Sequence, residues 1–260
     1  MADRFFMRFN LQNSVAHYPA TAEVFGALFS EEKEAAQEIL ADFEAIQSRR
    51  IAALTEKHGD ALTYLHGKRV LFLGDSITSD NLGYRVSVTR AARLCAEDGA
   101  ISGGTSATIL YSTMRKLREK KPELVSLMIG CNDSMSVERE GLQQVSPEEY
   151  ERNLRAMLGW VAESGAKLLL FEVSPIREDC FAHHSMDKGK RQSADNIARY
   201  NEILRNLAGE WGITVIPHAW IRTEEDKERY IERDGVHFTV EGQEAFSDYW
   251  LSQAISLYNT

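Results

Sequence analysis

The chain has 260 residues, which is enough for one large domain with an appendage. Hydrophobic residues make up 43% and charged residues 27%, so disordered, collagenous and coiled-coil compositions are excluded. Thirty basic and 39 acidic residues give a formal net charge of −9. This charge disfavours nucleic acid and anionic membrane surfaces as partners.

The cysteines and the first residues bear on the cellular compartment. Cys95, Cys131 and Cys180 are an odd number without C-x-x-C spacing, so neither a disulfide framework nor a thiolate zinc site is indicated. Arg8 and Asn10 interrupt the apolar residues of the first ten, which disfavours a secretory signal, and no apolar run is long enough to span a bilayer. We therefore expect a cytoplasmic protein with reduced thiols.

Residues 1–66 are predicted to be a helical N-terminal extension. Apolar residues recur at three- and four-residue steps from Glu31 to Lys57, with Ser30 as the expected N-cap and Gly59 as the expected stop. Such periodicity mainly reports burial, so the favoured interpretation is a helix that covers the core. A lid and an arm that pairs subunits are the alternatives.

Residues 67–260 alternate between short apolar runs and longer helical patterns, which is typical of α/β proteins. The predicted strands are Val70–Leu73, a short one near Ala100-Ile101, Leu124–Ile129, Leu168–Val173 and Ile213–Ile216. The predicted helices are Ser106–Lys120, Pro147–Glu163, Ala194–Trp211 and Val240–Leu257. The runs are apolar without alternation, as in buried parallel strands. We expect a three-layer α/β/α sandwich with a five-stranded, mostly parallel, flavodoxin-like sheet, and ligands at the carboxyl ends of its strands.

Three polar segments follow predicted strands. Gly74-Asp75-Ser76 places a serine after the first strand, where it is either a nucleophile or the N-cap of the next helix. Gly130-Cys131-Asn132-Asp133 places an amide donor after the third strand, or simply a turn or helix cap. Ser102-Gly103-Gly104-Thr105 lies between them, and its glycines allow close approach of a backbone N–H to a ligand or form a plain turn.

A fourth segment, Asp234-Gly235-Val236-His237, precedes the last predicted helix. Its spacing lets one short loop present a carboxylate and an imidazole together. Acyl transfer by a serine needs a base that removes the hydroxyl proton and a carboxylate that orients the base. Alone, this spacing more often marks a surface turn, but Ser76, His237 and Asp234 together fill the three roles.

These four segments, in this order, resemble the SGNH hydrolases, also called GDSL-type esterases and lipases. The resemblance covers roughly residues 68–250. It implies Ser76 as the nucleophile, His237 as the base and Asp234 as its acidic partner. It also implies an oxyanion hole made by the backbone N–H groups of Ser76 and Gly103 and the side-chain amide of Asn132.

The chain departs from the family pattern at two points. Similar members often have a glycine soon after the nucleophile, whereas Ser79-Asp80-Asn81-Leu82 precede Gly83 here. The position after Gly103 is often Asp or Asn and is Gly104 here, so either glycine is a candidate oxyanion donor. Neither departure affects the three residues of the expected triad.

The resemblance implies a serine esterase that acts on small acyl esters through an acyl-enzyme, plausibly on the O-acetyl group of a carbohydrate. An acyltransferase, a lipase or a thioesterase with the same triad is the nearest alternative, and a non-catalytic binding protein on the same fold is the alternative from another class. The scheme requires no cofactor and no metal. The adjacent His183 and His184 do not indicate a metal site, because neighbouring side chains on an extended or helical segment point in different directions. An oligomer through the N-terminal helices stays open.

A basic segment from Pro175 to about Gln192 follows the fourth predicted strand and is expected to overhang the active site. Its basic residues are Arg177, His183, His184, Lys188, Lys190 and Arg191. They either hold a substrate carboxylate or phosphate or, as the favoured interpretation, form a solvated surface loop. Trp220 and Phe238 are candidates for the pocket lining, although single aromatic residues more often belong to the core.

Overall fold

A five-stranded parallel sheet forms the centre of the molecule. The computed structural model describes residues 6–9, 21–137, 142–184 and 189–259. Within these residues the strand order is β2-β1-β3-β5-β7, with every neighbouring pair parallel. The strands are β1 (Arg69–Gly74), β2 (Cys95–Asp98), β3 (Leu124–Met128), β5 (Lys167–Phe171) and β7 (Val215–Ile216). The predicted flavodoxin-like sheet is confirmed.

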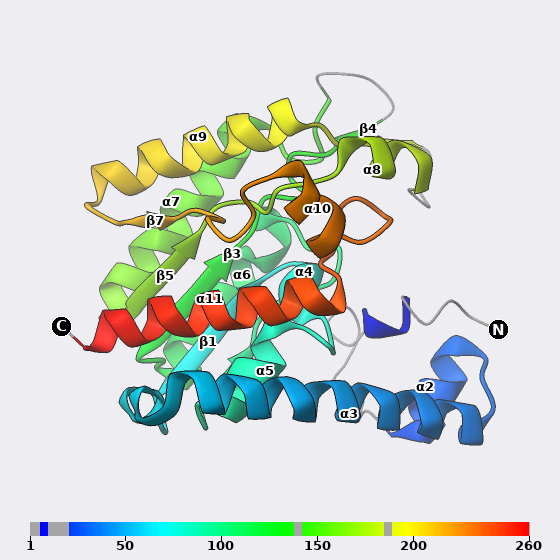
Figure 1. Ribbon diagram of the computed structural model, residues 1–260. Helices are drawn as coiled ribbons and strands as arrows, with labels where there is room; N and C mark the ends of the chain where they lie inside the picture. Colours follow the sequence, from blue (N-terminus) through cyan, green and yellow to red (C-terminus); the bar gives the residue numbers. More distant parts are fainter. Residues whose placement is uncertain (1–5, 10–20, 138–141, 185–188, 260) are drawn as a thin grey trace.

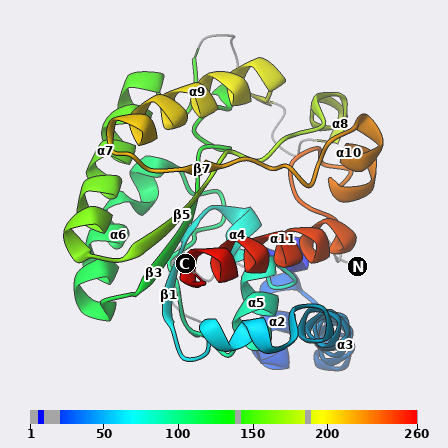
Figure 2. The same cartoon turned by 60° about the vertical axis from the view of Figure 1, so that its left-hand side comes forward.

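Helices cover both faces of the sheet, which makes three layers (Figures 1 and 2). α6, α7 and α9 lie on one face, and α5 and α11 lie on the other. The bounds of these helices are α5 (Tyr84–Ala91), α6 (Ser106–Lys120), α7 (Pro147–Ser164), α9 (Ala194–Glu210) and α11 (Val240–Tyr258). The start of α7 follows its sequence signal, because the Ser146 hydroxyl accepts a hydrogen bond from the Glu149 N–H and Pro147 occupies the first helical position.

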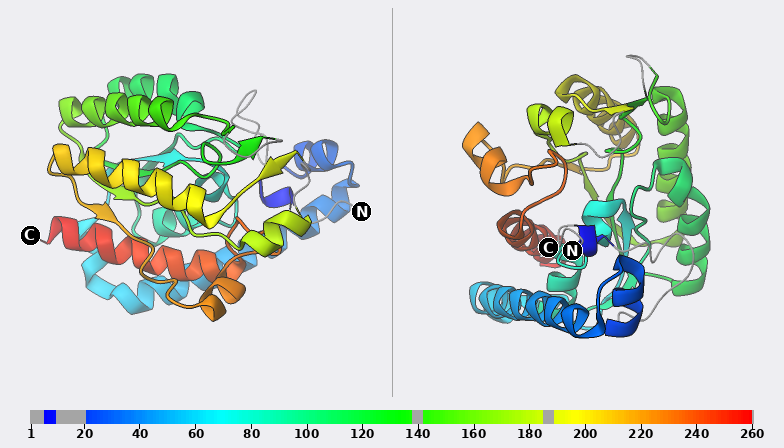
Figure 3. Two further views of the ribbon diagram at one scale, coloured as in Figure 1. Left: turned by 90° about the horizontal axis from the view of Figure 1, so that it is seen from above. Right: turned by 90° about the vertical axis from the view of Figure 1, so that its right-hand side faces the viewer.

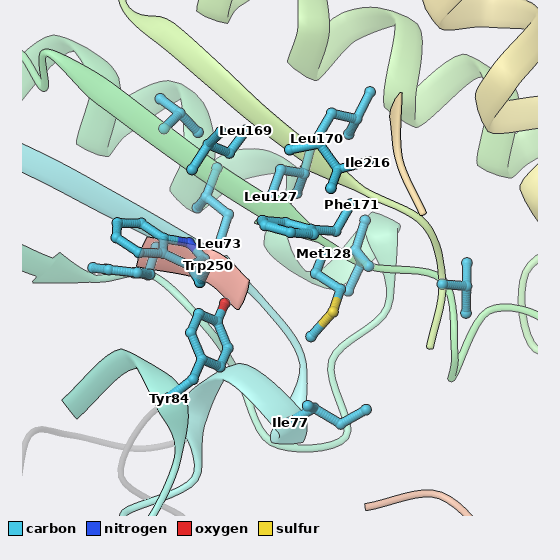
Figure 4. Close-up of a cluster of buried hydrophobic side chains, with 14 of the residues drawn as sticks. Leu73, Ile77, Tyr84, Leu127, Met128, Leu169, Leu170, Phe171, Ile216 and Trp250 are labelled. Atoms are coloured by element: carbon cyan, nitrogen blue, oxygen red, sulfur yellow. The ribbon is translucent and has the colours of Figure 1, made fainter. Parts of the chain in front are cut away.

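The core lies between the sheet and its helices. All five residues of β3 are buried, as expected of a central parallel strand covered on both faces. Figure 4 shows Trp250 of α11 and Tyr84 of α5 beside Leu73 of β1. The buried Trp250 indole N–H donates to the Ser126 hydroxyl at 2.9 Å, so the polar atom of this large side chain keeps a partner inside the core.

The N-terminal segment adds an outer layer on the α5 and α11 side. It contains η1 (Phe6–Arg8), α2 (Ala22–Phe29), α3 (Lys33–His58) and η2 (Gly59–Tyr64). α3 runs alongside α5 and α11, and its buried Arg50 donates to the carbonyl oxygens of Leu82 and Val240. Leu54 belongs to the main core, whereas Phe25 and Ile39 belong to a second, smaller apolar cluster. The division into units 1–66 and 67–260 stays a prediction. Among the described residues, every helix is too short or too polar to cross a membrane.

One helix boundary was predicted incorrectly. Ser30 is not the N-cap of the long helix but the C-cap of α2, with a left-handed φ of 56°. α3 instead begins after Glu32, whose side chain makes no capping hydrogen bond. Only a few residues separate α2 from α3, so the spacing of apolar residues did not show where α2 ends and α3 begins. The predicted stop at Gly59 is confirmed, since Gly59 caps α3 with a φ of 50°.

The second strand was also misplaced. It is Cys95–Asp98 rather than the apolar pair Ala100-Ile101. β2 is an edge strand with exposed and half-buried residues, so a search for buried apolar runs passes over it. The Ile101 N–H still donates to the Gly74 carbonyl at 3.0 Å, which keeps the following loop at the end of β1.

Short elements around the carboxyl edge of the sheet were not predicted. They are α4 (Ser76–Ser79), α8 (Glu178–His184), α10 (Glu224–Tyr230) and a two-stranded antiparallel sheet of β4 (Ser136–Val137) and β6 (Lys190–Arg191). Each is too short for a period to be recognised. Together they lie around the ends of the strands, at the edge that faces the viewer on the right of Figure 3.

Candidate active site

The site begins where β1 passes into α4. The Asp75 carboxylate accepts a hydrogen bond from the Ile77 N–H at 3.0 Å and is the N-cap of α4. Ser76 is therefore the first residue of the helix and not its cap, which removes the structural alternative for this serine. A Cβ atom at Gly74 would lie 2.6 Å from the Met128 carbonyl oxygen, so this turn requires glycine.

Ser76, His237 and Asp234 form a continuous chain of hydrogen bonds. Ser76 Oγ lies 2.6 Å from His237 Nε2, and His237 Nδ1 lies 2.5 Å from Asp234 Oδ2. The other oxygen of Asp234 accepts the backbone N–H groups of Val236 and His237 at 3.0 and 3.1 Å, which fixes the carboxylate in its own loop. The structure thus brings together the three residues that the sequence predicts for a serine hydrolase.

The electrostatics of this chain favour an ionised Asp234. Burial opposes ionisation, but the nearby His237 ring and the hydrogen bonds of the loop outweigh it and lower the pKa of Asp234 to about 2. The carboxylate therefore stays charged at neutral pH and can accept a proton donated by His237 Nδ1. This arrangement fixes the tautomer in which Nε2 faces Ser76 as an acceptor.

Candidate hydrogen-bond donors lie in the loops that follow β2 and β3. The Asn132 side-chain amide donates to the Gly104 carbonyl at 3.0 Å, which leaves its second N–H for another acceptor. The Gly104 N–H is engaged by the Ile101 carbonyl at 2.8 Å. Gly103 has a φ of 71°, and a Cβ atom there would meet open space. These contacts favour Gly103 over Gly104 as the backbone donor.

Asp133 holds the two donor loops together. Its buried carboxylate accepts the Ser106 backbone N–H at 2.9 Å and the Ser106 hydroxyl at 2.5 Å, at the start of α6. Burial raises the pKa of Asp133 to about 6. The sequence predicts Asp133 only as a turn residue or a helix cap. In the structure it fixes the loop of Asn132 against the loop of Gly103.

Comparison with known proteins identifies the family of this chain. A model of the GDSL-like Lipase/Acylhydrolase family matches residues 72–245, which is more than half of the chain and includes all of the site residues described above. The chain belongs to this family. It is accordingly a carboxylic ester hydrolase, and the resemblance found from the sequence segments is confirmed.

Individual relatives in this family act on different esters, judging by their names. The chain is 26% identical over 204 residues to "Thioesterase 1/protease 1/lysophospholipase L1" of Escherichia coli, covering 73% of this chain and 85% of the relative. It is 25% identical over 199 residues to "Isoamyl acetate-hydrolyzing esterase 1 homolog" of Bos taurus, covering 70% and 80%. The crystal structure of the acetyl xylan esterase AlAXEase is 22% identical, with a TM-score of 0.55 over 71% of this chain and 98% of that one, and shows the shared fold.

The basic segment of this GDSL-family chain packs against the loop that carries His237. The Arg177 N–H donates to the Gly235 carbonyl at 2.8 Å, and the buried Phe181 lies against Gly235. Lys190 and Arg191 belong to β6, which pairs with β4. The side chains of His183 and His184, and the whole of Lys188, lie outside the described residues. These contacts do not test whether the segment binds a substrate anion, which was the less favoured of its two interpretations.

Of the two aromatic candidates for the pocket, Phe238 belongs to the core and the half-buried Trp220 packs against it. Phe238 is fully buried, and Trp220 packs edge-on against it with ring centroids 5.0 Å apart. The Trp220 indole N–H donates to His218 Nδ1 at 3.2 Å, and His218 Nε2 lies 3.0 Å from the Glu172 carbonyl oxygen. Both His218 and Trp220 contact the ring of Phe238, which follows His237 directly, so this group packs next to the His237 loop.

Other residues at the site carry no local sequence signal. Gln192 is buried, and its side-chain amide donates to the Cys131 carbonyl at 2.8 Å. Arg8 and Phe9 reach the His237 loop from the N-terminal segment. The sequence does not signal these contacts, because each joins residues that are far apart along the chain.

Proposed function

We propose that the chain hydrolyses small acyl esters with Ser76 as the nucleophile, His237 as the general base and Asp234 as its partner. The observation that carries this proposal is the 2.6 Å contact between Ser76 Oγ and His237 Nε2, continued at 2.5 Å to Asp234. His237 removes the hydroxyl proton as Ser76 attacks the carbonyl carbon, and Asp234 stabilises the imidazolium.

The oxyanion is assigned to three donors. They are the backbone N–H groups of Ser76 and Gly103 and the side-chain amide of Asn132. Negative charge develops on the carbonyl oxygen in the transition state, and donors fixed beforehand stabilise it without reorganisation. The contacts of Asn132 and Asp133 support this assignment, because they fix both loops before a substrate arrives. His237 then protonates the departing alcohol, and water releases the acid from the acyl-enzyme.

The substrate class we favour is an acetyl ester, with an O-acetylated carbohydrate as the leading candidate. Two similar proteins carry acetate esters in their names, an acetyl xylan esterase and an isoamyl acetate-hydrolysing esterase. A thioester is the second candidate, because the Escherichia coli relative is named a thioesterase. Transfer of the acyl group to an alcohol in place of water uses the same triad. A cytoplasmic location stays a prediction from the sequence.

Hydrolysis of p-nitrophenyl esters of increasing acyl length tests this proposal, with an acetyl thioester assayed in parallel. We expect fast turnover of the acetate, a fall with chain length, and loss of turnover in Ser76→Ala. Ser79→Ala is the matched control, because it makes the same change three residues later in α4 and should retain activity. Equal turnover in Ser76→Ala, or no turnover of any ester by the unaltered protein, contradicts the proposal. Preference for the thioester replaces the first substrate candidate with the second.

A further inference from the structure

A short N-terminal segment reaches the candidate active site. η1 (Phe6–Arg8) lies beside α4 at the carboxyl edge of the sheet (Figure 3, right), and Phe9 follows it in the chain. The segment lies outside the 72–245 region that matches the family, so the family pattern gives it no role. Its contacts with the site are specific, and they divide into an anchor made by Arg8 and a ring contact made by Phe9.

Arg8 contacts both segments that carry the triad, the one that follows Ser76 and the loop of Asp234 and His237. Its buried guanidinium donates to the Asp80 carboxylate at 2.5 Å, to Glu232 at 2.8 Å and to the Phe238 carbonyl at 2.8 Å. Asp80 follows directly after the helix of Ser76, whereas Glu232 and Phe238 lie on either side of Asp234 and His237. A buried guanidinium with several charge-assisted partners holds one geometry, because moving it would leave buried charges unpaired.

Arg8 binds to the stretch that follows Ser76 and departs from the family pattern. Asp80 is fully buried, and its carboxylate also accepts the Leu82 N–H at 2.8 Å and the Gln243 side-chain amide at 3.0 Å. The Asn81 N–H donates back to the Arg8 carbonyl at 3.0 Å. Of the four residues between Ser76-Ile77-Thr78 and Gly83, which depart from the family pattern, Asp80 and Asn81 therefore bind the N-terminal segment.

This anchor places Phe9 on the imidazole of His237. The two ring centroids lie 4.1 Å apart with an interplanar angle of 39°, and Phe9 is half-buried. In the proposed mechanism His237 Nε2 donates a proton to the oxygen of the departing alcohol, so the alcohol must lie within hydrogen-bond distance of that atom. A side chain in contact with the imidazole ring therefore borders the space of the alcohol.

We propose that Phe9, held by Arg8, is a specificity-determining residue for the alcohol half of the ester and favours alcohols with an apolar or ring-shaped face. This inference rests on the proposed function. In the step concerned, the bond between the carbonyl carbon and the alcohol oxygen breaks, the acyl group stays on Ser76 Oγ, and the alcohol leaves with the proton from His237. Phe9 contacts the alcohol only until that point.

The two-step mechanism gives the proposal a distinctive signature. The alcohol has left before water attacks the acyl-enzyme, so a residue that recognises only the alcohol changes acylation and not deacylation. A residue that merely keeps the site in shape changes both steps. Acyl-chain preference likewise stays unchanged if Phe9 contacts only the alcohol.

The test compares benzyl acetate with ethyl acetate in Phe9→Ala. Both esters share the acetyl group, so they form the same acyl-enzyme. We expect the ratio of kcat/KM for benzyl to ethyl acetate to fall roughly 3- to 10-fold, the range expected from loss of one aromatic contact. The deacylation rate after a p-nitrophenyl acetate burst and the acetate-to-butyrate ratio should stay within about 2-fold.

Three further variants control this experiment. Phe9→Tyr keeps the ring and should keep the ratio, and Phe29→Ala removes a ring of the extension that packs on Phe25 and should also leave it unchanged. Arg8→Lys keeps the charge but loses the forked contacts, and the ratio should fall as in Phe9→Ala.

The outcomes separate the two proposals. An unchanged benzyl-to-ethyl ratio in Phe9→Ala overturns the inference while the esterase proposal stands. A parallel fall of acylation and deacylation also overturns it, because it marks a structural role. A retained ratio in Arg8→Lys overturns the role of the anchor. No ester hydrolysis by the unaltered protein contradicts the proposed function itself, and the inference falls with it.

Discussion

The two edges of the central sheet differ in the chemistry of their side chains. At the carboxyl edge, Ser76 after β1 contacts His237 of the half-buried Asp234–His237 pair, and Asn132 after β3 contacts Gly104. At the amino edge lies an open groove of about 800 Å³, bordered by Arg118, Trp160 and other side chains. Of the described residues that line this groove, none is a histidine or a cysteine.

Two cations of the amino-edge groove, Lys167 and Arg69, have a structural explanation. Lys167 Nζ donates to the Leu257 carbonyl at 2.6 Å near the end of α11, and Arg69 Nε donates to the Lys121 carbonyl at 2.9 Å after α6. Basic side chains satisfy the free carbonyl groups at helix C-termini and interact favourably with the helix dipole. The volume of the groove therefore does not mark it as the active site, whereas the contact between Ser76 and His237 supports the proposed site at the carboxyl edge.

The largest effect on this comparison is expected from Asp234→Asn at the carboxyl edge. The amide cannot hold His237 in the tautomer that accepts the Ser76 proton, so kcat should fall by about 10⁴. Steady-state hydrolysis of p-nitrophenyl acetate measures this effect, with circular dichroism to check the fold. Asp195→Asn is the control, since Asp195 is exposed in the first turn of α9 and should retain activity. A fall in kcat of less than 10-fold in Asp234→Asn would contradict the proposal that the reaction takes place at the carboxyl edge.

A smaller effect is expected from Asn132→Ala. Removing one oxyanion donor should lower kcat by roughly 10²–10³ while KM changes little, because the donor acts mainly in the transition state. The same ester assay with a full KM determination checks this. An unchanged kcat would show that the amide of Asn132 only ties its loop to Gly104.

The carboxyl edge also contains a buried histidine whose ionisation affects stability. Burial lowers the pKa of His218 to about 4 from 6.5, so between these values the unfolded chain binds more protons than the folded one. The stability that this neutral imidazole contributes is complete above pH 6.5 and is lost as the pH falls toward 4. Between pH 7 and pH 5 the unaltered protein should lose about 2 kcal/mol more unfolding free energy than His218→Gln.

Urea unfolding at the two pH values measures this difference. His66→Gln is the matched control, because it makes the same substitution at an exposed histidine. Equal losses in the unaltered protein and in His218→Gln would contradict the argument from burial. Asp75 and Asp133 titrate in all of these proteins alike, so their contribution cancels in the comparison.

The smallest effect is expected at the amino edge. Arg118 is exposed on α6 and borders the groove, so Arg118→Ala should leave kcat/KM for p-nitrophenyl acetate within about 2-fold. The same assay checks it. A loss of more than 10-fold would mean that this edge contributes to the reaction and would remove the contrast between the two edges.

The sequence predicted what is encoded locally. The serine after β1, the amide after β3 and the Asp234–His237 pair are each recognisable within four residues, and the strand pattern places them at one edge. The central strands and α6 were predicted because their burial produces a clear apolar pattern. β2 was misplaced for the opposite reason, since an edge strand exposes its side chains.

Contacts between distant residues account for the rest. Arg8 meets Asp80 and Phe238 across 72 and 230 positions, and no composition or period signals such a contact. Ser30 has the side chain of an N-cap but the left-handed backbone of a C-cap, a choice that tertiary packing decides. The core of the site is therefore predictable from sequence, whereas the side chains that surround it require the fold.

Labelling with a fluorophosphonate tests the central claim most directly, because the reagent forms a stable adduct only with an activated serine. Intact-mass measurement should give one adduct per chain, located by peptide mapping at Ser76. The adduct should be absent from Ser76→Ala and retained in Ser79→Ala. No adduct on the unaltered protein, or an adduct that persists in Ser76→Ala, would contradict the assignment of Ser76 as the nucleophile.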